Sequence, residues 1–289
     1  GTVLMSVTVG FSLPSAYLLG NYSDPGADRL HTALGDVGDG LVCLKEHGVA
    51  SIEIRPLYDG LSSQDLMGLC HGIWDTGLSL TFHGYLPEGP GRGSIAERYP
   101  CLQDFVKECP GTDTIITVHS YTIEAGTPRD AIAMNVEFLK YLCEDIEAHG
   151  GGFKVATEIN RAKGVIDASN YYDLLVEIYE RVEHDRLGFC WDFGHAYKNF
   201  TLNEIPEYPP ITFSRRVIHT HIHDLSVTGV THWPLTERCL PCGGYVGELL
   251  KHGYNGVLNL ELEPRRWAED GDFRSGILDS IDILQGMIA

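Results

Sequence analysis

Short apolar segments alternate with amphipathic segments along the whole chain. Eight apolar runs predict strands, at residues 7–11, 50–54, 78–83, 114–119, 153–158, 187–192, 217–224 and 257–261. Helical patterns lie between them, at about 28–47, 62–75, 94–108, 128–149, 169–184, 244–252 and the C-terminal end. Residues 14–25 predict a long loop, and residues 196–213 predict irregular structure with one short helix.

This alternation predicts one α/β domain with a parallel sheet. Eight strand–helix units in 289 residues fit a single (β/α)₈ TIM barrel that spans residues 1–289. A doubly wound open sheet fits less well, because no glycine-rich dinucleotide motif follows any predicted strand.

The seventh predicted strand carries three histidines at alternate positions, His219, His221 and His223, and ends at Asp224. Successive side chains of a strand point to opposite faces, so these histidines share one face. A single histidine there would favour a half-buried strand with an ordinary hydrogen bond. Three on one face favour a metal site or an active site, because imidazole is the commonest metal ligand.

Polar residues recur where the other predicted strands end. Active sites of such barrels lie at the C-terminal ends of the strands. Seven of the eight strand ends carry a potential ligand or acid–base group: Glu53 with Arg55, His83, His119, Glu158, Asp192 with His195, His221 with Asp224, and Glu261 with Glu263.

Each of these groups also has a purely structural interpretation. Glu53 and Arg55 could form a surface ion pair, and Asp192 could cap the following helix. His83 or His119 could be a buried histidine with satisfied hydrogen bonds. Glu261 and Glu263 could be solvated charges at a strand end. The joint pattern favours a site more strongly than any single member does.

Composition narrows the class of partner. The net charge is −19, which opposes binding to nucleic acid or to an anionic membrane surface, although a small anion can still bind locally. No apolar run is long enough to predict a membrane span. Eight scattered cysteines indicate reduced thiols and a cytoplasmic location. The motif Cys239-Leu-Pro-Cys242 has no second pair beside it and is a weak metal or redox signal.

Several motifs together resemble the xylose-isomerase-like barrel superfamily of sugar isomerases and epimerases, which also includes inosose dehydratases and the endonuclease IV group. The motifs are His119-Ser-Tyr121, Glu158-Ile-Asn160-Arg161, Asp192-Phe-Gly-His195, His221-Ile-His-Asp224 and Gly253-Tyr-Asn-Gly-Val-Leu-Asn-Leu-Glu261.

The resemblance implies one divalent metal held by Glu158, Asp192, His221 and Glu261. This ligand set suits Mn²⁺, Mg²⁺ or Co²⁺, and also Zn²⁺. Glu158 and Glu261 would move a proton at a carbon next to a carbonyl, with His195 as a further catalytic residue that contacts the substrate. Asp224 would orient the metal site from behind. The expected substrate-binding residues are Glu53, His83, His119, Arg161, His232, Glu263 and Arg265.

The chain departs from its relatives at two places. Ser226-Val-Thr228 stands where the epimerases carry a sugar-binding arginine, for which Arg161, Arg265 or Arg266 could substitute. Of the two extra metals of the endonuclease IV group, the first matches His83, His119 and Glu158. The second needs an aspartate where Val230 precedes Thr231 and His232, so one or two metals are expected rather than three.

The sequence therefore predicts a metal-dependent isomerase or epimerase whose partner is a small sugar, polyol or sugar phosphate. A dehydratase is close to this prediction, because it starts with the same proton abstraction. A metal-dependent phosphoesterase is the rival from another class, and a non-catalytic carbohydrate-binding barrel is disfavoured. No nucleic acid or membrane partner is expected, and the sequence leaves homo-oligomer formation open.

Overall fold

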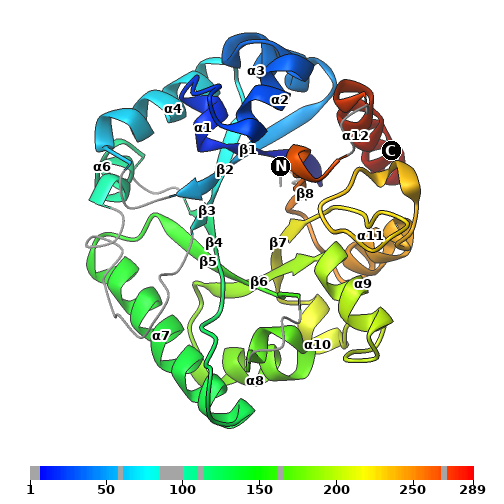
Figure 1. Cartoon of the computed structure of the whole chain (residues 1–289). Helices are drawn as coiled ribbons and strands as arrows, with labels where there is room; N and C mark the ends of the chain where they lie inside the picture. The colour runs from blue at the N-terminus through cyan, green and yellow to red at the C-terminus, as the bar shows by residue number, and fades with distance from the viewer. Residues whose placement is uncertain (1–6, 58–60, 85–99, 110–112, 162–165, 268–271) are drawn as a thin grey trace, which may run out of the picture.

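The computed structural model describes residues 7–57, 61–84, 100–109, 113–161, 166–267 and 272–289. Eight parallel strands form one sheet in the order β7-β6-β5-β4-β3-β2-β1-β8. A bridge between Ile222 and Leu260 joins the two edges, so the sheet closes into a barrel (Figure 1). The strands are β1 (Thr8–Pro14), β2 (Val49–Leu57), β3 (Ser79–Gly84), β4 (Thr114–Val118), β5 (Phe153–Glu158), β6 (Leu187–Asp192), β7 (Val217–His221) and β8 (Val257–Leu260).

Helices surround the barrel (Figure 1), as expected for a (β/α)₈ fold. They are α1 (Ser15–Leu18), α2 (Pro25–Leu34), α3 (Val37–Glu46), α4 (Ser63–Asp75), α6 (Pro100–Glu108), α7 (Pro128–Ala148), α8 (Tyr172–Val182), α9 (Phe193–Thr201), α10 (Ile211–Ser214), α11 (Cys242–Lys251) and α12 (Phe273–Ile288). The described ranges also contain three 3₁₀ turns: η1 (Ala168–Asn170), η2 (Leu235–Glu237) and η3 (Pro264–Arg266). No helix of the described ranges is long and apolar enough to cross a membrane.

The strand predictions are confirmed to within a few residues, whereas four predictions between the strands were wrong. The expected loop at 14–25 contains α1, and the expected helix at 28–47 is two helices. Gly35 separates them at φ 85°, a left-handed conformation that a helix interior cannot accommodate. Ser169 lies inside η1, while Tyr171 is the N-cap of α8. The region 196–213 holds most of α9 and all of α10. Part of the helix predicted at 94–108 lies outside the described residues.

The alternation along each strand separates two environments. On β3, Phe82 points outward and contacts Phe105 of α6 edge to face, with ring centroids 5.0 Å apart. The next residue, His83, is buried on the inner side. On β6, Phe189 packs outward and its ring stacks on Phe213 of α10 at 4.5 Å. Apolar packing thus holds the helices to the sheet and leaves the barrel interior to polar side chains.

Candidate metal centre and active site

Four side chains from four strands converge at the C-terminal end of the barrel. Nδ1 of His221 lies 3.4 Å from Oε2 of Glu158 and 3.5 Å from Oε2 of Glu261. Asp192 is the register partner of His221 on the neighbouring strand, and ligand atoms of Asp192, His221 and Glu261 lie within 4.8 Å of one another. The structure therefore brings together the four residues for which the sequence predicts one metal ion.

The atoms that face one another are also the ones left without hydrogen bonds. In the described part of the chain, Nδ1 of His221 and Oε2 of Glu158 and Glu261 are buried and make no well-oriented hydrogen bond. Buried polar atoms are rarely left this way unless an ion, a water molecule or a ligand satisfies them. One imidazole nitrogen and carboxylate oxygens form a donor set that a divalent metal accepts, so these residues fit the group.

Glu53 lies behind His221 and fixes its ring. Oε2 of Glu53 lies 2.9 Å from Nε2 of His221 and 2.9 Å from Nε2 of His219, and the Glu53 side chain is fully buried. Burial raises the pKa of Glu53, but His221 and His219 outweigh it and hold that pKa well below its usual range. An ionised Glu53 accepts the Nε2 proton of His221, so Nδ1 is the nitrogen that a metal would bind when it displaces the proton there.

This position changes the interpretation of Glu53. A surface ion pair with Arg55 is wrong, because Glu53 and Arg55 are both buried. Substrate contact, the role predicted for Glu53, does not match its position, because it lies beneath His221. Arg55 instead donates to Glu261 at 3.0 Å and to Glu263 at 3.2 Å.

Asp192 is both a helix cap and a candidate ligand. Its Oδ1 accepts a hydrogen bond from the backbone N–H of His195 at 2.7 Å, at the start of α9. Nδ1 of His223 accepts from the backbone N–H of His232 at 2.9 Å, so Nε2 of His223 carries the proton. That nitrogen lies 2.9 Å from Oδ1 and 3.2 Å from Oδ2 of Asp192. His223 therefore holds the Asp192 carboxylate in place.

The space for His223 depends on a glycine. A Cβ on Gly194 would lie 2.0 Å from Cε1 of His223, a distance that no packing tolerates. The sequence did not predict that His223 holds Asp192 in place. The sequence feature that could have indicated it is the position of His223 on the same strand face as His221.

Two more histidine side chains, His83 and His119, lie beside the Glu158 oxygen that also faces His221. Nε2 of His83 and Nε2 of His119 lie 3.3 Å and 3.1 Å from Oε2 of Glu158. Their rings are 4.9 Å apart, edge to face. These are the three residues for which the resemblance implies a second metal, and they are neighbours in space.

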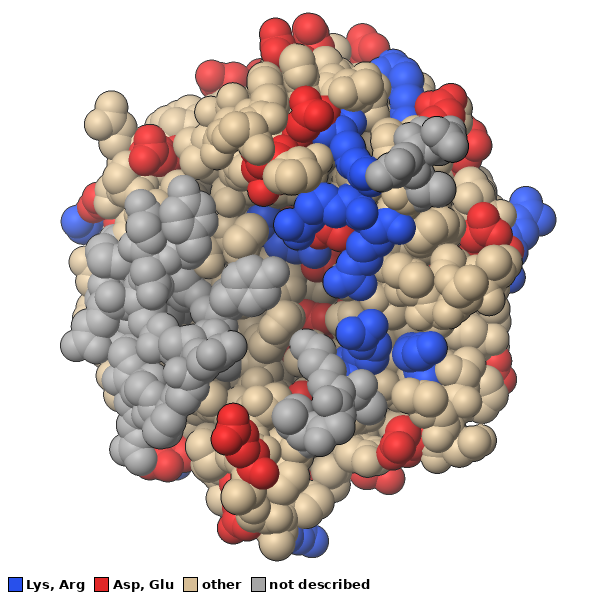
Figure 2. Space-filling view, viewed as in Figure 1, with Lys and Arg blue, Asp and Glu red and all other residues tan. Residues whose placement is uncertain are grey.

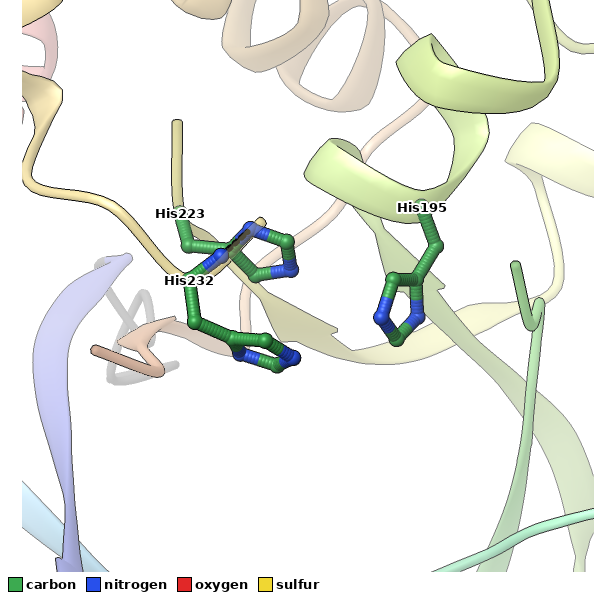
Figure 3. A group of neighbouring side chains, drawn as sticks. All are labelled: His195, His223 and His232. Atoms are coloured by element: carbon green, nitrogen blue, oxygen red, sulfur yellow. Dashed lines mark hydrogen bonds between the residues drawn. The ribbon is translucent and has the colours of Figure 1, made fainter. Parts of the chain in front are cut away.

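Three further histidines meet beside the first centre (Figure 3). His195 comes from α9, and the rings of His223 and His232 stack with centroids 4.1 Å apart. Their ring nitrogens come close enough for one ion. However, both nitrogens of His223 are engaged, with the His232 amide and with Asp192, so this group lacks a free third ligand.

The ionisable groups at the centre shift one another's pKa values. Burial raises the pKa of Asp192 well above its ordinary value, and the charges of Glu158 and Glu261 raise it further. Burial opposes ionisation of Glu158, but His119 and His221 hold its pKa well below the usual range. The pKa of His221 is raised well above its ordinary value, since Cys190 and the carboxylates of Glu261, Glu53 and Glu158 outweigh burial. The excess of carboxylate is what a divalent cation would neutralise.

A cavity of about 220 Å³ opens above these residues. Among its lining residues are seven predicted site residues besides Glu158 and Glu261: His83, His119, Arg161, His195, His232, Glu263 and Arg265. Arg55, Asn160, Thr231 and Arg266 also line it. Glu53, Asp192 and His221 lie behind this wall, where they are buried.

Asp224 has a different role from the one expected. Its carboxylate accepts hydrogen bonds from the backbone N–H groups of Leu225, Cys239 and Leu240, at 2.7, 2.9 and 3.0 Å. It therefore fixes the loop that leads into α11. The expectation that its side chain orients the metal ligands is corrected, and His223 and Glu53 occupy that role.

Several proteins of known structure have a similar fold. The chain superposes on a xylose isomerase domain protein from Alicyclobacillus acidocaldarius with a TM-score of 0.65 and 15% identity, covering 98% of each chain. It superposes on a D-psicose 3-epimerase from Clostridium cellulolyticum H10 (TM-score 0.61, 15% identity, 96% and 99% covered). It is also similar to the IOLI protein with a bound zinc atom (TM-score 0.64, 14% identity, 98% of each chain covered). At these identities the likeness shows the fold.

In sequence, 77 residues are 36% identical to an uncharacterized protein of Methanocaldococcus jannaschii; they cover 26% of this chain and about a quarter of that relative's length. The profile of the xylose isomerase-like TIM barrel family matches residues 44–284, most of the chain. The chain therefore belongs to the xylose isomerase-like TIM barrel family.

Proposed function

We propose that this protein is a divalent-metal-dependent isomerase or epimerase that acts on a small sugar, polyol or sugar phosphate. The observation that carries the proposal is the convergence of Glu158 and Glu261, from β5 and from the end of β8, on one imidazole nitrogen below the cavity. A metal bound there would polarise a carbonyl and the hydroxyl beside it. A small carbohydrate is the proposed partner, with no nucleic acid.

The two glutamates are suited to move a proton. The pKa of Glu261 is lowered, because His221 and Arg55 outweigh the effect of burial. Glu158 is also held ionised, so either carboxylate can accept a proton from a carbon acid. Because they come from different sides of the barrel, one could remove the proton and the other return it. Nδ1 of His195 lies 3.2 Å from Oε1 of Glu158 and can exchange a proton with it.

The test is metal-dependent exchange of a carbon-bound proton with deuterated solvent, over a panel of sugars and sugar phosphates. Glu158→Gln and Glu261→Gln should each slow exchange by roughly 10² to 10⁴, the usual contribution of a general acid or base. The matched control is Glu144→Gln, an exposed glutamate of α7, which should exchange normally. The metal must be saturating and its content measured in each variant.

A glutamine variant that turns over a sugar at the unaltered rate, with metal bound, contradicts the shuttle. Elimination of water from the substrate after proton abstraction would assign the dehydratase alternative.

One observation favours a second candidate function. His83 and His119 both lie beside Glu158, and a second metal held by these residues would suit hydrolysis of a phosphate ester. Two bound metal ions and cleavage of an abasic duplex, without carbon–proton exchange, would favour that candidate.

A further inference from the structure

The rim of the cavity differs in charge from its floor. We infer that the substrate carries an anionic group, a phosphate monoester or a carboxylate, which binds between Arg161 and Arg266. This inference rests on the proposed function, since it takes the cavity above Glu158 and Glu261 as the substrate site. Of the substrate classes named there, it favours those with an anionic group over neutral sugars and polyols.

Four arginines line the cavity, and their partners differ. Arg55 is paired with Glu261 and Glu263, and Arg265 with Glu263 at 3.0 and 3.2 Å. Arg161 and Arg266 differ from these two. Among the described residues, no carboxylate is close enough to either guanidinium to form an ion pair with it.

The orientation of Arg266 is fixed without neutralising its charge. Its Nη1 donates to Oγ1 of Thr231 at 2.6 Å and lies 3.4 Å from the Thr231 carbonyl. Both acceptors are neutral, so the guanidinium is held over the cavity with its charge intact. A planar guanidinium matches the oxygen geometry of phosphate and carboxylate, which is why arginine is common where such groups bind.

The electrostatics agree with an anion site. Burial lowers the pKa of Arg266, and repulsion from Arg161 and Arg55 lowers it further, against the effect of Glu263. Arginine still remains charged at any pH the protein meets. Crowding of like charges is unfavourable, and a bound anion would relieve it.

The distribution of charge over this face also points to a ligand. The whole chain carries a net charge of −19, yet Figure 2 shows lysine and arginine side chains gathered around the central hollow. The acidic groups of the centre lie below, where Glu158 and Glu261 are almost fully buried. A divalent metal would neutralise that floor, and the rim would remain positive. An anionic tail at the rim would leave the rest of a small substrate over the floor.

The experiment uses the metal-loaded protein and three sets of probes with matched carbon skeletons. They are neutral ketoses, their terminal phosphate monoesters, and sugar acids. Affinity is measured by calorimetry, and KM and kcat by proton exchange. One anionic set should bind at least about tenfold more tightly than the neutral set, and the set that does so identifies phosphate or carboxylate.

Variants connect the preference to the two arginines. Arg161→Gln and Arg266→Gln should each raise KM for the anionic probe by roughly ten- to a hundredfold, the effect of losing a hydrogen bond to a charged group. Values of kcat should change little, and Arg266→Lys should recover part of the loss. The control is Arg215→Gln, an exposed arginine just before β7, at the opposite end of the barrel.

The possible failures are distinguishable. Equal or tighter binding of neutral ketoses, with exchange intact, overturns the anion inference and leaves the proposed function standing. Absence of exchange with every probe overturns the proposed function, while the calorimetric preference still decides the anion inference. Tight, salt-sensitive binding of abasic duplex DNA that depends on Arg161 and Arg266 would assign these arginines to a nucleic-acid backbone, and so overturn the inference.

Discussion

His221 and His232 are both buried and both lie close to Glu261, yet their surroundings are opposite. Nδ1 of His221 lies 3.5 Å from Oε2 of Glu261, and Nδ1 of His232 lies 3.4 Å from the same atom. The pKa of His221 is raised well above its ordinary value by Cys190 and the carboxylates around it. The pKa of His232 is held well below its ordinary value by burial and by its neighbours His223, His195, Arg55 and Arg266.

The difference shows two layers of opposite electrostatic character in one small site. The floor, around His221, is rich in carboxylate and suits a cation. The rim, around His232, is rich in arginine and suits an anion. A substrate that bridges both layers would bind the metal with its reacting end and the arginines with its charged end.

Removal of His221 should produce the largest effect on metal binding. His221→Ala removes the only imidazole among the four predicted ligands. Mutation of a residue that hydrogen-bonds to a metal ligand typically lowers metal affinity roughly 10–100-fold. Loss of the ligand His221 itself should lower the affinity for Mn²⁺ or Zn²⁺ by more than that. His232→Ala, from the other layer, should lose less than about tenfold. Metal content after dialysis against graded free metal measures both. An equal loss of metal affinity in the two variants would contradict the assignment of the metal to the floor rather than the rim.

Removal of the charge behind His221 should have a smaller effect. Glu53→Gln keeps the shape of the side chain but weakens the acceptor for the Nε2 proton, so metal affinity should fall roughly 10–100-fold. The matched control is Ser12→Ala, because Ser12 donates to the other oxygen of Glu53, at 2.7 Å. Metal titrations and thermal unfolding of both variants separate this effect from misfolding. An unchanged affinity in Glu53→Gln would show that the ring needs no carboxylate behind it.

For each displaced proton, a change of one pH unit should alter metal affinity less than either substitution does. The pKa values of Asp192 and His221 are raised, so the metal-free protein keeps protons there that a metal must displace. Affinity should therefore rise with pH by about tenfold per pH unit for each displaced proton, until both groups are deprotonated. His223, whose pKa burial lowers to about 4, should contribute no proton at neutral pH.

Calorimetry in buffers of different ionisation enthalpy counts the protons released. Affinity that is constant or that increases on acidification would contradict the assigned directions of these pKa values.

Strand positions were predictable because their signal is local. Short, nearly continuous apolar runs, such as Leu187–Asp192, form strands that are buried on both faces in a parallel barrel, and the eight predictions are confirmed. Helix limits were harder to predict. The break at Gly35 and the start of α8 at Tyr172 depend on how neighbouring elements pack, which a local pattern does not contain.

The sequence by itself determined the barrel, the inner face of β7 and the ligand types that the strand ends offer. These follow from periodicity and from the rule that parallel strands end together, so Glu158, Asp192, His221 and Glu261 had to lie at one end. Only the tertiary structure decided which groups support them. Glu53 is 168 residues from its partner His221, and Arg55 is 206 residues from Glu261. Such pairings form only when the barrel closes and buries these side chains. The sequence does not reveal them, because a glutamate beneath a metal ligand and a glutamate at the surface are the same residue type in the sequence.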